Sequence, residues 1–398
     1  MKRNELLYDL FQAYFDARRN KRNTHNQLRF EMHFESHLFQ LYEDIMERRY
    51  EINPSICFVI DKPVTREIFA ADFRDRVIHH LIFNYINPLL EQQFITDSYS
   101  CRKTKGTLYG IRRCESFIKE CSNGYTGSCY ILQIDISGYF MSINRKILKQ
   151  KIIKMLAPYH DKQTGLDFDL IYYLLDEVLE NDPTINCKFK GHPSDWQGVP
   201  RNKSLFYTPK DCGLPIGNLT SQLFSNVYLH DFDLFVKDTL KMEYYGRYVD
   251  DAVFVHADKE VLKETLSKIR AFLREEFELD IHPNKVYLQH YSKGISFLGA
   301  YIKPGRTYIR NRTKKKFIHA VETWDRICRH GIVEKEVLPQ MRATLNSYLG
   351  IMKHHKTYRL KRKIIYRRPR SFFKYGYFGK SLEVFFIKKK YLDNNGLN

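Results

Sequence analysis

The sequence of 398 residues lacks any apolar run of the roughly 18 residues that a membrane-spanning helix needs. Its N-terminus (MKRNELLYDLF) also lacks the long apolar core of a signal peptide. The eight cysteines include no C-x-x-C pair, and their spacing suits neither a zinc site nor a small disulfide scaffold. Internal repeats and low-complexity tracts are also missing. These absences favour a cytoplasmic protein with reduced and mostly buried thiols.

Charge is distributed unevenly along the chain. Residues 300–398 contain 25 Lys and Arg against 6 Asp and Glu, whereas residues 1–299 contain 40 of each sign. The formal net charge of +19 therefore lies entirely in the last quarter. This asymmetry indicates a polyanionic partner that the C-terminal quarter binds, and its mixture of basic and aromatic residues is typical of a groove that follows nucleic-acid backbone.

An acidic pair, Asp250 and Asp251, interrupts the stretch from Glu243 to His256 (EYYGRYVDDAVFVH). Apolar and polar residues alternate on both sides of the pair, which predicts two strands joined at a hairpin tip. Side chains alternate across a strand, so two consecutive aspartates can point the same way only where the backbone turns. Taken alone, the pair is more typical of an ordinary polar turn.

A third carboxylate makes a metal site the better interpretation. Asp135 ends the apolar run in YILQIDISGYF (130–140), where an isolated acid would be costly to bury without partners or a cation. Beside Asp250 and Asp251 on a neighbouring strand, it would complete an oxygen cage for two Mg²⁺ ions. Two such ions, about 3.5 to 4 Å apart, can activate a 3′ hydroxyl and stabilise leaving pyrophosphate. The three carboxylates therefore predict phosphoryl transfer.

Three arginines are candidate contacts for a triphosphate or a template. Arg66 and Arg74 lie within REIFAADFRDRV, and guanidinium groups suit phosphate, although ion pairs with neighbouring aspartates compete. Arg102 belongs to the basic, glycine-containing segment SYSCRKTKG, which precedes a helical pattern and can cradle phosphate.

An aromatic pair and a glycine turn are further candidates. Tyr139 and Phe140 follow Asp135 by four and five positions. An aromatic side chain there belongs either to the core or beneath the sugar of a nucleotide, where it would exclude a 2′ hydroxyl. Residues 213–233 begin with a Gly and Pro turn and continue as an amphipathic helix. The turn glycines let the backbone approach a template base or a nucleotide closely.

In chain order, these features resemble the motif series of reverse transcriptases. The series consists of Asp135, LPIG (214–217), YVDD (248–251), Lys285 and FLG (297–299), and the resemblance covers about residues 15 to 305. It implies an α+β fold, the right-hand polymerase. The implied domains are N-terminal helices and fingers over 1–134, a palm over 135–299 with an inserted segment at 144–212, and a basic helical thumb over 300–398.

The resemblance also implies roles for individual residues. Lys285 would protonate the leaving pyrophosphate, and Phe140 would stand at the sugar-discriminating position. The implied ligands of two Mg²⁺ ions are Asp135, Ile136, Asp250 and Asp251. The implied nucleotide-binding residues are Arg66, Arg74, Arg102, Tyr139, Phe140, Ile216 and Gly217. The implied primer grip is Ser296, Phe297, Leu298 and Gly299.

The motif LPIGNLTSQ narrows the resemblance to one branch of the reverse transcriptases. Most reverse transcriptases have QG where this chain has Ile216 and Gly217, and SP where it has Ser221 and Gln222. The pattern IGNxxSQ resembles the diversity-generating retroelements of bacteria and their phages, as do REIFAADFRDRV, SYSCRKTKG and RNKSLF. This branch implies copying of template RNA into cDNA from deoxynucleoside triphosphates, with frequent errors opposite adenine. It also implies a small, basic, oligomeric accessory protein.

Two alternatives remain open. One is a reverse transcriptase of the retron or group II intron type with ordinary fidelity, which the IG and SQ substitutions disfavour. The other is an RNA-binding, maturase-like protein with a vestigial site, which the intact Asp135, Asp250 and Asp251 disfavour. We expect no integrase, ribonuclease H or protease domain in the 398 residues.

Overall fold

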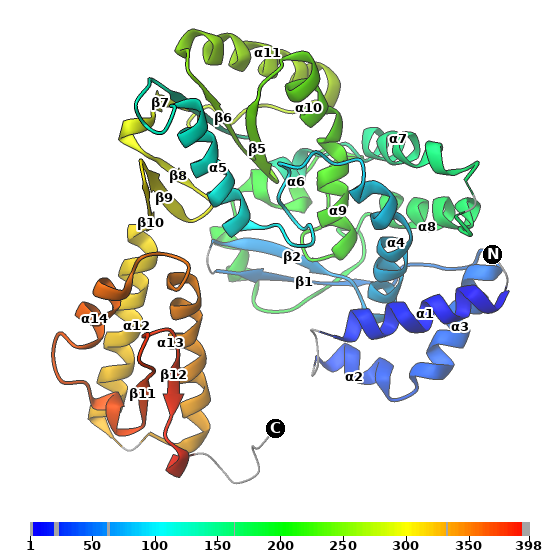
Figure 1. Ribbon diagram of the computed structural model, residues 1–398. Coiled ribbons are helices and arrows are strands. Elements are labelled where there is room, and N and C mark those ends of the chain that lie inside the picture. Colours follow the sequence, from blue (N-terminus) through cyan, green and yellow to red (C-terminus); the bar gives the residue numbers. More distant parts are fainter. Residues whose placement is uncertain (1–2, 20–23, 62–63, 163, 332, 392–398) are drawn as a thin grey trace. The chain divides into compact units, whose positions relative to one another are not determined.

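Figure 1 shows the computed structural model of the chain, which describes all residues except 1–2, 20–23, 62–63, 163, 332 and 392–398. The chain forms two compact units. The first contains Met1–Gly106 and Leu132–Leu288, and the second contains Thr107–Ile131 and Gln289–Asn398. Among the described helices, none combines the length and the apolar character that crossing a membrane requires.

The first unit begins with helices that surround one long helix. These are α1 (Arg3–Arg18), α2 (His25–Glu31), α3 (Phe34–Met46) and α4 (Phe73–Glu91). The side chain of Asp72 accepts a hydrogen bond from the Arg74 backbone N–H and so caps the start of α4. Both α3 and α4 pack against α1, whose Leu10 and Ala13 are fully buried between them.

A three-stranded sheet begins directly after α3 in the sequence. Its strands are β1 (Ser55–Ile60), β2 (Arg66–Ala70) and β4 (Cys187–Phe189), in the order β2-β1-β4. The pair β1–β2 is antiparallel, whereas β4 joins β1 in parallel from a segment more than a hundred residues later. Between β4 and Leu219, the chain contains only short 3₁₀ turns, at Pro193–Gly198, Arg201–Lys203 and Leu205–Tyr207.

A four-stranded sheet carries the acidic motifs. Its strands are β5 (Tyr244–Tyr248), β6 (Asp251–His256), β3 (Tyr130–Asp135) and β7 (Tyr287–His290), in the order β5-β6-β3-β7. Both β3 and β7 run from one unit into the other. The helices that complete the first unit are α6 (Tyr139–Ser142), α7 (Arg145–Leu156), α8 (Phe168–Glu180), α9 (Leu219–Tyr228), α10 (His230–Leu234) and α11 (Lys259–Phe277). Almost every residue of α9 is buried, because α4 and α7 both pack against it.

The second unit contains helices and two small sheets. Its helices are α5 (Thr107–Cys121), α12 (Asn311–His330), α13 (Leu338–Met352) and α14 (Tyr358–Ile365). One sheet is antiparallel with the order β10-β9-β8 and consists of β8 (Ile295–Phe297), β9 (Ala300–Lys303) and β10 (Arg306–Ile309). The other is the antiparallel pair of β11 (Gly376–Phe378) and β12 (Phe385–Ile387).

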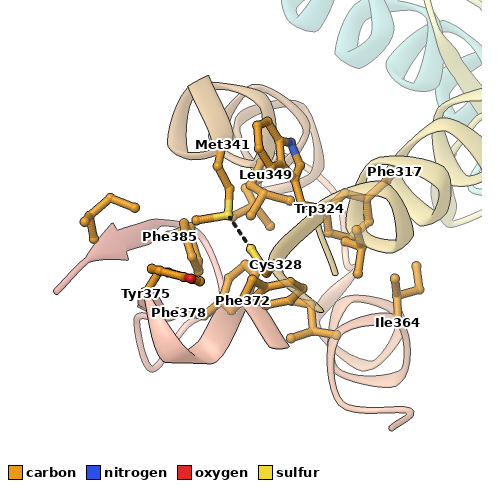
Figure 2. Close-up of a cluster of buried hydrophobic side chains, with 14 of the residues drawn as sticks. Phe317, Trp324, Cys328, Met341, Leu349, Ile364, Phe372, Tyr375, Phe378 and Phe385 are labelled. Carbon is orange, nitrogen blue, oxygen red and sulfur yellow. Dashed lines mark hydrogen bonds between the residues drawn. The ribbon is translucent and has the colours of Figure 1, made fainter. Parts of the chain in front are cut away.

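Figure 2 shows the core of this second unit, where aromatic and aliphatic side chains from α12, α13 and the last two strands meet. Cys328 and Met341 lie at its centre, with their sulfur atoms 3.9 Å apart. Residues 300–398, which were expected to be helical, contain the three helices α12, α13 and α14 and also the short strands β9 to β12. In β11 and β12, buried and exposed residues alternate with the period of two that defines strands. The assignment of fingers, palm and thumb to particular ranges stays a prediction.

Candidate active site

The hairpin predicted around the two adjacent aspartates is formed by β5 and β6. Tyr248 pairs with Asp251, which leaves Val249 and Asp250 as a two-residue turn. Val249 has φ +57°, a left-handed conformation that β-branched residues rarely adopt. Positive φ values in two-residue turns match the twist of the flanking strands. Backbone strain is therefore concentrated at the tip that carries the acidic pair.

The third carboxylate, Asp135, lies at the end of β3, the strand next to β6. The backbone N–H of Ile136 donates a hydrogen bond of 3.3 Å to the carbonyl oxygen of Asp250, which ties the end of β3 to the hairpin turn. The side chain of Ile136 is buried, so its backbone carbonyl is the group with which it could contact an ion. The structure thus brings together the three aspartates that the sequence singled out.

The charges of these aspartates act on one another. Burial, together with the negative charges of Asp135 and Asp251, raises the pKa of Asp250 to about 7. Lys285 donates a hydrogen bond of 2.6 Å from Nζ to Oδ2 of Asp135. Partial burial lowers the pKa of Lys285, but this hydrogen bond and the three negative charges outweigh that effect and raise its pKa. The cluster therefore attracts positive charge.

The chemistry of these donors fits Mg²⁺. Carboxylate oxygens are hard ligands, and Mg²⁺ is typically held by one or two carboxylates together with substrate phosphates. Within the described ranges, however, no group of three or more His, Cys, Asp or Glu side chains is arranged to hold a metal ion by itself. Lys285 instead supplies the positive charge that contacts Asp135. The repulsion that raises the pKa of Asp250 would be relieved by a cation.

A buried ion pair, which the sequence analysis did not single out, holds the hairpin in place. Arg247 and Asp233 are both fully buried, and two hydrogen bonds of 2.7 and 2.6 Å join the guanidinium to the carboxylate. Tyr245 donates a third, of 2.6 Å, to the same carboxylate. The remaining Nη1 of Arg247 donates to the carbonyl oxygen of Val249 over 2.9 Å. The ion pair thereby fixes the strained turn.

The outer edge of β5 is also fixed. The backbone N–H of Arg247 donates a hydrogen bond of 2.8 Å to the carbonyl oxygen of Asp97. The carbonyl oxygen of Arg247 accepts a hydrogen bond of 2.9 Å from the backbone N–H of Tyr99. The ring of Tyr99 lies so close to Gly246 that any Cβ at this position would collide with it. The glycine of YYGRYVDD is therefore required by packing.

The LPIG turn is joined by hydrogen bonds to two other elements. The N–H of Leu214 donates to the carbonyl oxygen of Phe140 over 2.8 Å, and the N–H of Phe69 in β2 donates to Ile216 over 2.9 Å. Gly217 has φ +134°, and a Cβ there would lie 2.9 Å from the carbonyl oxygen of Phe69. This position therefore requires glycine.

Phe140 and Ile216 share one environment. Both are partly buried and pack against the same hydrophobic cluster, which consists of Cys57, Phe69, Met141 and Leu205. Tyr139 is different, because it is buried and donates its hydroxyl to the carbonyl oxygen of Ser225 over 2.5 Å. Of the aromatic pair, Phe140 is thus the more open side chain, and Tyr139 anchors α6.

The candidate arginines lie in different environments. Arg66 is exposed at the start of β2. Arg74 donates to the carboxylate of Asp44 over 2.6 Å, and Arg102 donates to the carboxylate of Glu91 over 2.8 Å. These two arginines lie at opposite ends of the 19-residue helix α4, which is roughly 28 Å long. That each of them contacts a triphosphate or a template stays a prediction.

The expected primer grip forms a hairpin in the second unit. Phe297 pairs with Ala300, and the turn between them, Leu298 and Gly299, has positive φ at both positions. Arg310 donates to the Ser296 hydroxyl over 2.6 Å. The contact of this hairpin with a primer stays a prediction.

Basic side chains also gather in the second unit. A cavity of about 620 Å³ is lined by Arg306, Lys353, Lys356, Arg359 and Lys361. Lys361 is buried, and desolvation lowers its pKa even though Glu383 lies near enough to oppose that shift. This concentration of cations agrees with the charge asymmetry of the sequence.

Comparison with known proteins decides the family. A family model described as reverse transcriptase (RNA-dependent DNA polymerase) matches residues 61–302. The chain belongs to the reverse transcriptase family. Its enzyme class is therefore that of RNA-directed DNA polymerases, and its mixed helix and sheet architecture is the right-hand polymerase fold of that class.

Two relatives are similar in sequence over most of this chain. Protein YkfC of Escherichia coli (strain K12) is 21% identical over 317 residues, which cover 71% of this chain and 74% of YkfC. The putative COX1/OXI3 intron 2 protein of Saccharomyces cerevisiae is 20% identical over 388 residues, which cover 81% of this chain but only 44% of that protein. The chain thus spans less than half of the yeast relative.

Solved telomerase structures are similar at a lower level. The apo telomerase from Candida tropicalis, truncated from the C-terminal domain, has a TM-score of 0.46 and is 14% identical to this chain. The matched region is 65% of this chain and 55% of that telomerase. The telomerase from Candida albicans in complex with a fragment of telomeric RNA has a TM-score of 0.47 and 13% identity, with 79% of this chain covering 60% of it. In both cases the chain spans less than two thirds of the telomerase.

Proposed function

We propose that this chain copies a template RNA into error-prone, adenine-mutagenised cDNA for a diversity-generating retroelement. Family membership supports RNA-directed DNA synthesis. The observation that carries the proposal is the meeting of Asp135 with the Asp250–Asp251 tip, because three carboxylates supply what two-metal nucleotidyl transfer needs from a protein. The motif LPIGNLTSQ supports the mutagenic branch.

The carboxylates of Asp135, Asp250 and Asp251, with the carbonyl of Ile136, would hold two Mg²⁺ ions. Bound there, the ions would activate the primer 3′ hydroxyl and stabilise the leaving pyrophosphate. Asp250 has to lose its proton first, because its pKa is raised to about 7. Lys285 keeps its proton on Nζ, and as a general acid it can pass that proton to the leaving pyrophosphate.

Selection of the nucleotide would depend on the more open aromatic residue of the pair. Phe140 would lie beneath the sugar and exclude a 2′ hydroxyl, which favours deoxynucleoside triphosphates. The hydrogen bond of Tyr139 to Ser225 would hold α6 so that Phe140 keeps its position. Arg66 is the exposed candidate for phosphate, whereas release of Arg74 or Arg102 would first break the ion pairs of these residues.

Low fidelity would originate at the LPIG turn. A glutamine beside the nascent base pair can hydrogen-bond the template or the nucleotide, whereas the aliphatic side chain of Ile216 cannot. The backbone of this turn is fixed by its hydrogen bond to Phe69, so a change of side chain acts on the pair without moving the turn. Geometric checking is therefore weaker with isoleucine.

The proposed partners follow from charge and from the branch. Template RNA and the RNA/cDNA duplex would be bound by the basic second unit, whose cavity collects five cations. The hairpin from Ser296 to Gly299 would contact the primer. A small, basic, oligomeric accessory protein would assist the enzyme, as in the branch that the sequence resembles.

The test is the error spectrum of Ile216→Gln. We expect fewer misincorporations opposite template adenine than in the wild type, measured by deep sequencing of cDNA made on a primed RNA template. Ile216→Leu is the matched control, because it keeps an aliphatic side chain and should keep the wild-type error spectrum. Equal error rates for the wild type and Ile216→Gln would reject the role of Ile216.

The similarity to a yeast intron protein favours, as a second candidate, an intron-type reverse transcriptase of ordinary fidelity. The same sequencing separates the two. Few errors, without concentration opposite adenine, would assign the chain to this second candidate and leave its polymerase activity unaffected.

A further inference from the structure

An open group of aromatic side chains lies in the segment between α8 and α9 of the first unit. We call Phe189, Trp196, Phe206 and Tyr207 the aromatic platform. The rings of Phe189 and Phe206 are stacked, with centroids 5.8 Å apart and planes 17° apart, and Trp196 meets Phe189 edge-on at 5.4 Å. Phe189 is 62% exposed and Tyr207 61% exposed. All four residues line a cavity of about 560 Å³.

The aromatic platform is held by a buried carboxylate. Glu67 of β2 accepts hydrogen bonds from Nε1 of Trp196 at 2.8 Å, from the Ser204 hydroxyl at 2.9 Å and from the Leu205 N–H at 2.7 Å. Glu67 is only 2% exposed, so removal of any of these donors would leave part of a buried charge unsatisfied. The exposed rings therefore belong to a fixed structure.

One exposed cation, Arg201, lines the cavity of the aromatic platform, and the same segment carries four more exposed cations. Between residues 183 and 210 the chain has five basic residues and one acidic residue, Asp195. The carboxylate of Asp195 accepts the His192 N–H over 2.9 Å. The guanidinium of Arg201 lies over the ring of Tyr207, 5.2 Å from its centre. The exposed basic side chains are Lys188, Lys190, Arg201, Lys203 and Lys210.

We propose that the aromatic platform binds unpaired bases of a single-stranded RNA template. Stacked, exposed rings among cations are the combination that single-stranded nucleic acids require, since bases stack on the rings and phosphates pair with the cations. Surfaces that bind folded proteins are instead depleted of lysine. This inference rests on the proposed function for the identity of the strand as template.

The position of the aromatic platform supports this role. Phe206 contacts Phe69 in β2, with ring centroids 5.5 Å apart. Phe69 belongs to the hydrophobic cluster against which Phe140, Ile216 and Trp196 all pack. The aromatic platform and Ile216 therefore pack against one hydrophobic cluster, which supports a path of the template strand past both.

The test measures binding without Mg²⁺ or nucleotides, so that it does not depend on polymerase activity. Two labelled single strands of equal length, oligoadenylate and an abasic strand with the same phosphates, are titrated with the full chain by fluorescence anisotropy. We expect Phe189→Ala to weaken oligoadenylate binding about tenfold, the loss of one stacked base, and to leave abasic-strand binding unchanged. Phe189→Trp should restore the affinity.

Tyr8→Ala is the matched control, because Tyr8 is an aromatic residue on α1 that is 70% exposed and lies outside the aromatic platform. It should bind both strands like the wild type. Tyr207→Ala provides a second variant if Phe189→Ala does not fold. Unchanged oligoadenylate binding, or an equal loss on the abasic strand, would overturn the proposal. A wild type that binds oligoadenylate in preference but makes no cDNA would instead contradict the proposed function alone.

Discussion

The acidic hairpin of the first unit and the basic surface of the second unit use charge in opposite ways. At the hairpin, the charges of Arg247 and Asp233 are buried and joined by paired hydrogen bonds. On the second unit, cations such as Lys356 and Arg359 are exposed beside an open cavity. The same kind of side chain therefore fixes a backbone turn through a buried ion pair in one region and presents exposed positive charge in the other.

The physical consequence is a difference in what each charge stabilises. A buried charge without its partner strongly destabilises the folded state, because the remaining charge has lost its hydration. An exposed cation contributes little to folding, but it releases a counterion when it binds a phosphate. Substitutions in the two regions should therefore be separable by measurements of unfolding and of RNA binding.

The largest effect is expected from Arg247→Met. This substitution leaves Asp233 buried and unpaired, so the free energy of unfolding should fall by about 3 to 5 kcal/mol in urea denaturation. Arg274→Met is the control, because Arg274 and its partner Asp280 form an exposed ion pair in the same unit. The control should unfold like the wild type. Equal losses in both variants would remove the distinction between buried and exposed pairs.

We expect an effect of intermediate size from a change of pH, on Mg²⁺ affinity and on folding stability. The pKa of Asp250 is raised to about 7, so below pH 7 a Mg²⁺ ion has to displace a proton from this carboxyl group. The apparent affinity for Mg²⁺ should therefore fall about tenfold for each pH unit below 7 and stay constant above pH 7. The same raised pKa makes the metal-free folded state lose stability between pH 3.8 and about 7, because the unfolded chain ionises first. Calorimetric titration with Mg²⁺ from pH 6 to 8 checks the affinity, and a flat profile would contradict it.

The smallest effect is expected on the second unit. Lys356→Gln combined with Arg359→Gln should leave the unfolding free energy unchanged and weaken binding of RNA duplex. The slope of log affinity against log salt should become shallower by about 2, which is roughly one unit per lost phosphate contact. The matched control is the pair Lys263→Gln and Lys268→Gln on α11, where both lysines are paired with glutamates. A salt slope like that of the wild type would refute the assigned RNA contact.

The features that could be predicted from the sequence are those that interrupt a regular pattern of apolar residues. Asp135, Asp250 and Asp251 stand out because each breaks an apolar strand run, and the structure places all three at the ends of neighbouring strands. The segment around β11 and β12 was missed, because its basic and aromatic residues obscured a three-residue alternation that is too short to detect.

Other features depend on partners that are distant in sequence. Arg247 was visible as a charged residue in an apolar strand, but its pairing with Asp233 depends on how α10 packs against β5. Arg102 and Arg74 have the charge of phosphate-binding residues, yet tertiary contacts with Glu91 and Asp44 determine where their guanidinium groups lie. Composition alone cannot separate a cation that is already paired from one that is available to a ligand.

The most direct test of the account is synthesis of cDNA by the purified chain on a primed RNA template, with Mg²⁺ and all four deoxynucleoside triphosphates. Asp250→Asn is the comparison, because it keeps the size of the side chain but removes its charge from the carboxylate cluster. We predict cDNA from the wild type and a loss on the order of 10³-fold in the variant. Equal amounts of cDNA from both proteins would contradict the assignment of the carboxylate cluster as the catalytic centre.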